Sequence, residues 1–248
     1  MNHKILGVIT ARGGSKSINK KNIKVLLKKP LIVYTIEAAK KSGVFDRIIV
    51  STDSEEIAEV CRKHGVEVPF MRPAELAGDT TPHLPVMQHA VSWLREKEGY
   101  EPDYVMILQP TSPLRQAFHI KEAVQLIKST GADSVLSAAE IPEIFHPLKA
   151  LIHGEDGLLK LASGAPVRKR AIRRQDLPKS YWSVTAIYLF KTGLLYDKEA
   201  PNFYGEKVVP YVMHDKYAVD INEPKDWFLA EKALKNLYKE NGDKIAHR

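Results

Sequence analysis

The sequence has little of what marks several common classes of protein. One cysteine, Cys61, among 248 residues excludes an internal disulfide and a zinc site of the Cys-x-x-Cys type. No apolar run approaches the ~20 residues of a membrane-spanning helix, and the N-terminus lacks the apolar stretch of a signal peptide. The nine histidines show no His-Glu-x-x-His spacing. We therefore expect a cytoplasmic globular protein without membrane association, in which Cys61 is a packed thiol.

The formal charge is +7, which is compatible with nucleic acid, an acidic membrane surface or small polyanions as partners. The basic residues are dispersed along the chain, and no RNA-binding or zinc-finger signature accompanies them. Nucleic acid is therefore not the expected partner.

A glycine-bearing basic loop follows the first apolar run, which begins at Ile5. Gly13 and Gly14 can adopt backbone conformations closed to other residues, so their N–H groups could point at phosphate oxygens. Arg12, Lys16, Lys20 and Lys21 add positive charge. The spacing fits neither a Walker A loop nor a dinucleotide-binding Gly-x-Gly-x-x-Gly. The loop predicts a polyphosphate site, and a solvated turn without a ligand is the alternative.

Strand and helix patterns alternate along most of the chain. We expect helices over 30–42, 54–65, 84–97, 119–129 and 224–238, and strands over 47–51, 66–70, 104–108, 134–138, 184–190 and 208–212. This alternation predicts one α/β domain over residues 1–248, Rossmann-like and doubly wound, with a mostly parallel sheet. Loops after parallel strands share one rim, so the loops at Arg12, Thr52, Gln109 and Ala139 should lie along the same edge of the sheet. The tail after Asn241 is expected to fray.

The alternation of strand and helix patterns stops between residues 141 and 182. Four prolines and the basic run from Arg168 to Arg174 interrupt the alternation. We interpret this segment as an inserted arm that covers the site or joins a second subunit, and a loose surface loop is the alternative.

Several ordered motifs resemble the acylneuraminate cytidylyltransferases. They are Ala11-Arg12-Gly13-Gly14-Ser15-Lys16 with Lys21-Asn22, Arg72-Pro73-Ala74-Glu75-Leu76 followed by Asp79, and Leu108-Gln109-Pro110-Thr111-Ser112-Pro113-Leu114-Arg115. The resemblance spans roughly the whole chain. It implies a fold of the nucleotide-diphospho-sugar transferase type. It also implies transfer of a cytidylyl group from CTP to the anomeric hydroxyl of a sialic-acid-like nonulosonic acid, with release of pyrophosphate.

The same resemblance implies roles for individual residues. Arg12, Lys21 and Asp220 would be catalytic, and Asp220 and Asn222 would bind Mg²⁺. The nucleotide would be bound by Arg12, Gly13, Ser15, Lys16, Lys21, Asn22 near the ribose, Arg72 near the cytosine, and Asp79. The sugar acid would face Gln109, Lys149, Arg174 and Tyr188. The arm implies a homodimer.

Two departures from the family pattern keep alternatives open. The family usually has Asp-Ile-Asp where this chain has Asp220-Ile221-Asn222, so metal affinity would be weaker, and Asn222 could instead cap the last helix. Val184-Thr185 replaces a common Asn-Gly, which disfavours ordinary N-acetylneuraminate. Kdo, a sugar 1-phosphate, another base, or a catalytically impaired nucleotide-binding protein remain alternatives.

Three sugar-site assignments also have simpler interpretations. Tyr188 could be a core residue, Lys149 a solvated lysine, and Arg173 could take the place of Arg174.

Overall fold

The computed structural model describes residues 3–170 and 173–246 and contains one six-stranded sheet. The strand order is β10 (Val208–Val212), β6 (Ser134–Glu140), β9 (Tyr181–Lys191), β5 (Tyr104–Leu108), β1 (Ile5–Thr10) and β4 (Arg47–Ser51). All neighbours are parallel except β9, which runs antiparallel to both β5 and β6. The predicted Rossmann-like, mostly parallel sheet is therefore confirmed, with β9 as the exception.

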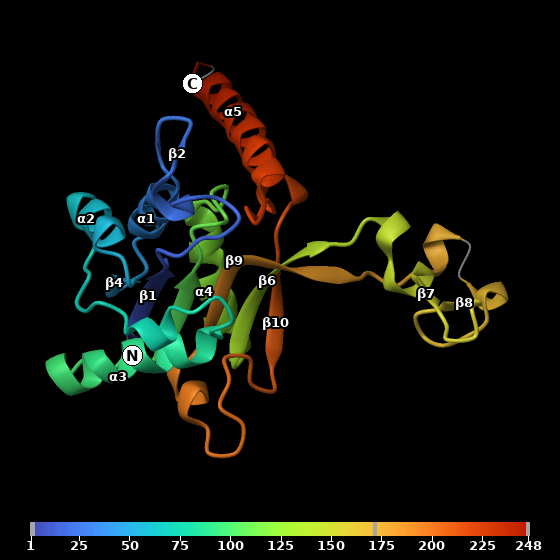
Figure 1. Cartoon of the computed structure of the whole chain (residues 1–248), viewed down its shortest axis with the longest axis horizontal. Helices are drawn as coiled ribbons and strands as arrows, with labels where there is room; N and C mark the ends of the chain where they lie inside the picture. The colour runs from blue at the N-terminus through green and yellow to red at the C-terminus, as the bar shows by residue number, and fades with distance from the viewer. Residues whose placement is uncertain (1–2, 171–172, 247–248) are drawn as a thin grey trace.

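Helices cover both faces of this sheet (Figure 1). On one face lie α1 (Leu31–Ser42), α2 (Glu55–Lys63) and α4 (Ala117–Thr130), and on the other lies α3 (His83–Glu98). Each face has its own hydrophobic core: the first cluster packs under α1, α2 and α4, and the second packs under α3. Strand β1 reflects this arrangement, because Ile5 and Ile9 belong to the first cluster whereas Leu6 and Val8 belong to the second. Cys61 belongs to the first cluster, and burial raises its thiol pKa to about 12, so it is a packed thiol as expected.

Three expectations for individual elements need correction. Residues 66–70 do not form the predicted strand. Glu67 makes an isolated bridge to Ile49 of β4, and the next residue after the range, Met71, makes another to Thr52. The last helix, α5 (Pro224–Ala246), continues past Asn241 where fraying was expected. Strand β9 begins at Tyr181, earlier than predicted, because its first residues pair with the end of β6. Among the described residues, no helix is both long and apolar enough to cross a membrane.

The segment between β6 and β9 projects away from the sheet as an arm (Figure 1). It carries the short helical turns η3 (Glu143–Phe145) and η4 (Pro147–Lys149) and a hairpin of β7 (Leu151–His153) and β8 (Leu159–Leu161). His146 ties the outgoing and returning strands together, because its ring contacts the Pro178 carbonyl at 2.9 Å and the Ser180 hydroxyl at 2.8 Å. A minor hairpin of β2 (Val25–Leu26) and β3 (Lys29–Pro30) precedes α1.

Candidate active site

A pocket of about 470 Å³ lies beyond the carboxyl ends of β1 and β5. Nine of the residues predicted for the site line it: Arg12, Ser15, Lys16, Lys21, Asn22, Arg72, Asp79, Gln109 and Asn222. They come from four separate stretches of the chain. Parallel strands deliver their following loops to the same rim, which is why residues so far apart in sequence meet here.

The loop after β1 is fixed by contacts from the segment after β4 and from its own end. Asp53 accepts the Gly13 N–H through Oδ1 at 2.8 Å, and Asn22 Nδ2 donates to the Arg12 carbonyl at 2.9 Å. A Cβ atom on Gly13 would lie 2.9 Å from Ser54 Cβ, whereas one on Gly14 would meet nothing within 4 Å. Neither glycine has a positive φ. The expected special backbone conformation is therefore wrong, and Gly13 is required by close packing instead.

Two cations of this loop share one carboxylate. Arg12 Nη1 lies 2.7 Å from Asp79 Oδ1, and Lys16 pairs with Asp79 Oδ2. The hydrogen bond from Lys16, followed by that from Arg12, holds the pKa of Asp79 below its usual value. Lys20 points elsewhere, because its ammonium pairs with Glu56 at 2.7 Å. An anionic ligand would thus compete with Asp79 for Arg12 and Lys16.

Lys21 connects the loop to the segment before α5. Its ammonium donates to the Ile221 carbonyl at 2.9 Å, and Ser17 Oγ donates to the Asn222 carbonyl at 2.6 Å. Burial lowers the pKa of Lys21, and the charge of Asp220 opposes that shift. The loop and the 220–222 segment, which are about 200 residues apart in sequence, therefore form one wall.

Asp220 offers an oxygen that suits a hard cation. Its Oδ2 accepts a hydrogen bond from Asn222 Nδ2 at 2.8 Å, while its Oδ1 is buried and has no hydrogen-bond partner among the described residues. Among the described residues, no group of three or more aspartate, glutamate, histidine or cysteine side chains could hold a metal ion. The donor set fits a Mg²⁺ ion that takes most of its ligands from phosphates and water.

Asn222 does not cap α5 through its side chain. The carboxylate of Asp226 accepts the N–H groups of Asn222 and Glu223, at 2.9 and 2.8 Å, and so caps the helix. The Asn222 amide turns to Asp220 instead. The alternative that Asn222 serves only as an N-cap is therefore wrong.

Arg72 is buried beside β4 and lines the pocket. Its Nε and Nη2 donate to the hydroxyl and carbonyl of Ser51, at 3.0 and 2.5 Å. Burial lowers the pKa of Arg72 to about 10, so the guanidinium stays charged near neutral pH. His83, at the start of α3, also lines the pocket. Burial lowers its pKa most, and the positive charge of Arg72 lowers it further. Sequence reasoning missed His83, which sits in a turn-rich stretch without a motif.

The residues predicted to face a sugar acid are divided between the core and the arm. Gln109 lines the pocket, and its carbonyl accepts a hydrogen bond from Arg115 at 3.1 Å. Tyr188 stands on β9 and packs edge-on against Phe203, with ring centroids 6.0 Å apart. Burial raises the pKa of Tyr188, and the charge of Asp220 acts in the same direction. Tyr188 is thus partly a core residue, as its simpler interpretation held, and the charge of Asp220 contributes to its pKa shift.

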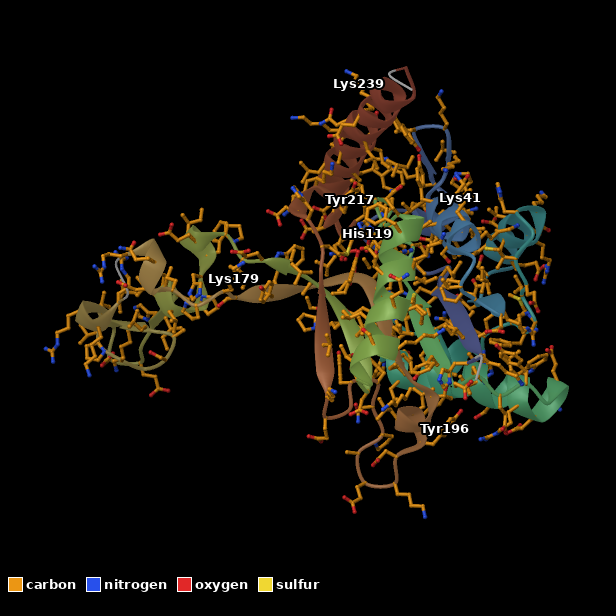
Figure 2. All side chains as sticks on the ribbon, turned by 180° about the vertical axis from the view of Figure 1, so that it is seen from behind. Lys41, His119, Lys179, Tyr196, Tyr217 and Lys239 are labelled. Atoms are coloured by element: carbon orange, nitrogen blue, oxygen red, sulfur yellow. The ribbon has the colours of Figure 1, made fainter. Side chains whose placement is uncertain are left out.

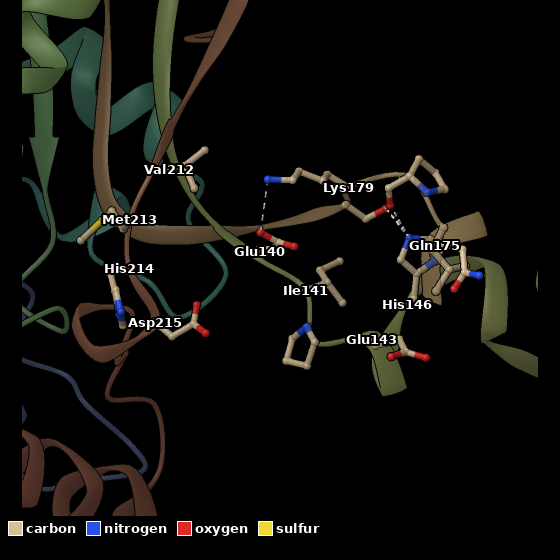
Figure 3. Close-up of a pocket in the computed structure, with 14 residues that line it drawn as sticks. Glu140, Ile141, Glu143, His146, Gln175, Lys179, Val212, Met213, His214 and Asp215 are labelled. Carbon is tan, nitrogen blue, oxygen red and sulfur yellow. Dashed lines mark hydrogen bonds and ion pairs between the residues drawn. The ribbon is translucent and has the colours of Figure 1, made fainter. Parts of the chain in front are cut away.

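Lys149 and Arg174 belong to the arm. Lys149 lies in η4 and donates to Glu143 at 2.5 Å. The side chain of Arg174 lies outside the described residues, whereas Arg173 pairs with Asp176 at 2.8 Å. A second pocket, of about 850 Å³, opens at the base of the arm against the end of β10 (Figure 3). Within one chain the arm projects beyond β6 and β10, away from β1, the strand that leads into the Arg12 loop (Figure 1).

Comparisons with known proteins agree with this geometry. A family model described as cytidylyltransferase matches residues 6–220. The chain is 35% identical to post-translational flagellin modification protein B of Campylobacter coli, over 93% of this chain and 95% of that protein. It is 34% identical to a CMP-N,N'-diacetyllegionaminic acid synthase of Campylobacter jejuni, over 94% and 97% of the two chains.

Other relatives are longer or only structurally similar. An N-acylneuraminate cytidylyltransferase of Streptococcus agalactiae is 32% identical over 97% of this chain, which spans 58% of that longer protein. A solved CMP:2-keto-3-deoxy-manno-octonic acid synthetase complexed with CTP shares the fold with a TM-score of 0.66, at 15% identity, over 94% and 99% of the two chains. With the family match spanning most of its length, from β1 to Asp220, this chain belongs to the cytidylyltransferase family.

Proposed function

We propose that this protein transfers a cytidylyl group from CTP to the anomeric hydroxyl of a nonulosonic acid. The observation that carries the proposal is one pocket lined by four cations, together with the amides Gln109 and Asn222; the cations are Arg12, Lys16, Lys21 and Arg72. Four cations around one pocket suit a triphosphate, and a neighbouring amide suits a polar sugar. Membership of the cytidylyltransferase family and the names of the relatives support the same reaction.

The reaction forms a bond between the sugar oxygen and the α-phosphorus of CTP and breaks the bond to pyrophosphate. The attacking oxygen must approach a phosphorus surrounded by negative oxygens, so positioning and charge neutralisation supply most of the catalysis. Arg12 and Lys16 would exchange Asp79 for phosphate oxygens. Lys21 is held by the Ile221 carbonyl close to Asp220, where it would neutralise charge that develops at the reacting phosphate.

A Mg²⁺ ion would be held by Asp220 and Asn222. When bound, the ion neutralises phosphate charge and orients the leaving pyrophosphate. The supporting observation is the buried Oδ1 of Asp220, which has no hydrogen-bond partner in the described part of the chain. No covalent intermediate with the protein is required.

The arm would complete the sugar site in a homodimer. Lys149 sits on the arm, which projects away from β1 and its loop, so it would reach a sugar acid only in a second copy. The arm also exposes large apolar side chains, with Ile144 76% and Phe145 71% accessible, as expected of a surface that another chain covers.

Pyrophosphate release tests the proposal. The protein would be incubated with each of the four nucleoside triphosphates, Mg²⁺, and a panel of sialic, legionaminic, pseudaminic and Kdo-type acids and sugar 1-phosphates. Release with CTP and one nonulosonic acid is expected. Release with a sugar 1-phosphate or with another nucleotide would replace the proposed reaction, and failure to bind CTP by calorimetry would contradict it.

A matched pair of variants separates the pocket from general loop charge. Lys16→Met removes a cation that lines the pocket. Lys20→Met removes a cation four residues later in the same loop, whose ammonium pairs with Glu56 instead. We expect weaker CTP binding in Lys16→Met and wild-type binding in Lys20→Met. Equal effects would mean that the pocket is not the triphosphate site.

A further inference from the structure

Arg115 is a buried charge that the proposed reaction does not use. It ends the Gln-Pro-Thr-Ser-Pro-Leu-Arg loop between β5 and α4, and only 2% of its surface is accessible. Within the part of the chain that the structure describes, no carboxylate pairs with it, and its acceptors are two carbonyls and a hydroxyl. Burying an unpaired guanidinium is costly, so its retention calls for a specific role.

The guanidinium joins three separate segments around the pocket. It donates to the Ala186 carbonyl of β9 at 2.6 Å through Nη1. Through Nη2 it donates to Thr35 Oγ1 of α1 at 2.5 Å and to the Gln109 carbonyl at 3.1 Å. The planar fork of an arginine can hold several acceptors in one fixed arrangement, which a lysine cannot. One side chain therefore sets the position of Gln109 relative to β9.

The segment of β9 that Arg115 holds is irregular. Leu136 of β6 pairs with Tyr188, but Ala138 pairs with Ser183, so residues 184–187 bulge out opposite Ser137. The Ser137 hydroxyl fills the bulge by donating to the Val184 carbonyl at 2.6 Å and accepting the Ile187 N–H at 2.8 Å. Bulges of this kind re-aim the side chains that follow them.

The bulge also carries Val184 and Thr185, the two residues that depart from the family pattern. Thr185 Oγ1 lies 3.1 Å from Ser112 Oγ, a hydroxyl in the same loop as Gln109 and Arg115. The loop after β5 and the bulge of β9 are thus joined by Arg115 and by Ser112. Their relative position determines where Gln109 and Tyr188 stand.

We propose that Arg115 is a positioning residue that holds Gln109 and the 184–188 segment in register and so sets the affinity of the pocket for its sugar acid. Arg115 touches neither substrate. It acts through the Gln109 carbonyl and the Ala186 carbonyl, and Ser137 supports the same bulge from the opposite side. This proposal rests on the proposed function, because the sugar acid is its readout.

Three variants test the proposal. Arg115→Met keeps the apolar stem but removes the donors. Ser137→Ala loosens the same bulge without changing charge, and it decides the question if Arg115→Met does not fold. Ser134→Ala is the matched control, because Ser134 is also a buried serine of β6 but donates to the Tyr204 carbonyl. Each variant is measured for its melting temperature, CTP dissociation constant, and KM and kcat with N-acetylneuraminate, N,N'-diacetyllegionaminate or pseudaminate, whichever the wild type uses.

We expect kcat/KM for the sugar acid to fall roughly tenfold or more in Arg115→Met and Ser137→Ala, since small displacements of positioning groups are costly. CTP binding should stay within about twofold of wild type in both, and Ser134→Ala should keep the wild-type CTP affinity and kcat/KM, although loss of its hydrogen bond to Tyr204 lowers the melting temperature. An unchanged kcat/KM for the sugar acid, or losses of CTP and sugar acid affinity that match each other, would overturn the proposal.

Hydrogen exchange separates this proposal from the proposed function. Amides of residues 109–112 and 184–188 should exchange faster in Arg115→Met than in wild type or Ser134→Ala. If the wild type uses no sugar acid, the proposed function fails, while faster exchange still supports the positioning role. Unchanged exchange at these amides refutes that role whatever the wild type turns over.

Discussion

Lowering the pH from 7 to 5 should destabilise this protein through His119. The ring is 2% exposed and lies next to Tyr217, with ring centroids 4.6 Å apart (Figure 2). Its Nδ1 accepts the Gln116 N–H at 3.0 Å, so the neutral ring carries its proton on Nε2. Protonation of Nδ1 would break this bond and add a second buried charge near Arg115. Burial, followed by the charge of Arg115, lowers the His119 pKa from 6.5 to about 4.

The sign and size of the effect follow from that shift. Between pH 6.5 and about 4 the unfolded chain binds a proton at His119 that the folded protein does not, so stability falls as the pH falls through this window. Proton linkage with these two pKa values gives a loss of about 2 kcal/mol between pH 7 and pH 5, and about 3 kcal/mol once the window is crossed.

Urea unfolding followed by tryptophan fluorescence at pH 7 and pH 5 measures this loss. In His119→Asn the amide oxygen still accepts the Gln116 N–H, and the cost of the missing ring does not depend on pH. The wild type should therefore lose about 2 kcal/mol more than His119→Asn over this interval. His83 and His89, whose pKa values are also lowered, are present in both proteins and cancel. His64→Asn, at an exposed position after α2, controls for loss of a histidine. Equal losses in wild type and His119→Asn would refute the reasoning.

Three further predictions concern the pocket and the arm. Gly13→Ala should weaken CTP binding measured by calorimetry because its methyl group would press on Ser54, whereas Gly14→Ala should bind as wild type; equal binding by both would contradict the packing argument. Asn222→Asp adds a carboxylate beside Asp220 and should lower the Mg²⁺ concentration for half-maximal rate roughly tenfold. A large rise in its maximal rate would instead indicate that the wild type is catalytically impaired. Lys149→Met and Arg12→Met should each be inactive alone and regain partial activity when mixed and refolded together, because Lys149 would serve the pocket of the partner. If activity does not recover, Lys149 either serves the pocket of its own chain or belongs to no sugar site.

The order of elements could be predicted from the sequence because it depends on local patterns. The apolar run of 104–108 and the helical periodicity of 31–42 recur in the structure within a residue or two of their predicted bounds. The motifs after β1 and β5 were sufficient to bring Arg12 and Gln109 to one pocket, since loops that follow parallel strands share a rim. Arg72 was assigned to the same site by the family resemblance alone, and it also lines the pocket. The family could be identified from the same motifs.

What the sequence could not decide depends on contacts between distant segments. Nothing local indicates that β9 runs antiparallel between β5 and β6, or that its residues 184–187 bulge opposite Ser137. The partner of Asn222 was open until the structure placed Asp226 at the start of α5 and left the amide for Asp220. Gly13 is required because Ser54 packs against it, and Arg115 is costly because it is buried without a carboxylate. A polar side chain has the same bonding capacity in every fold, and only tertiary structure determines which partners burial leaves within its reach.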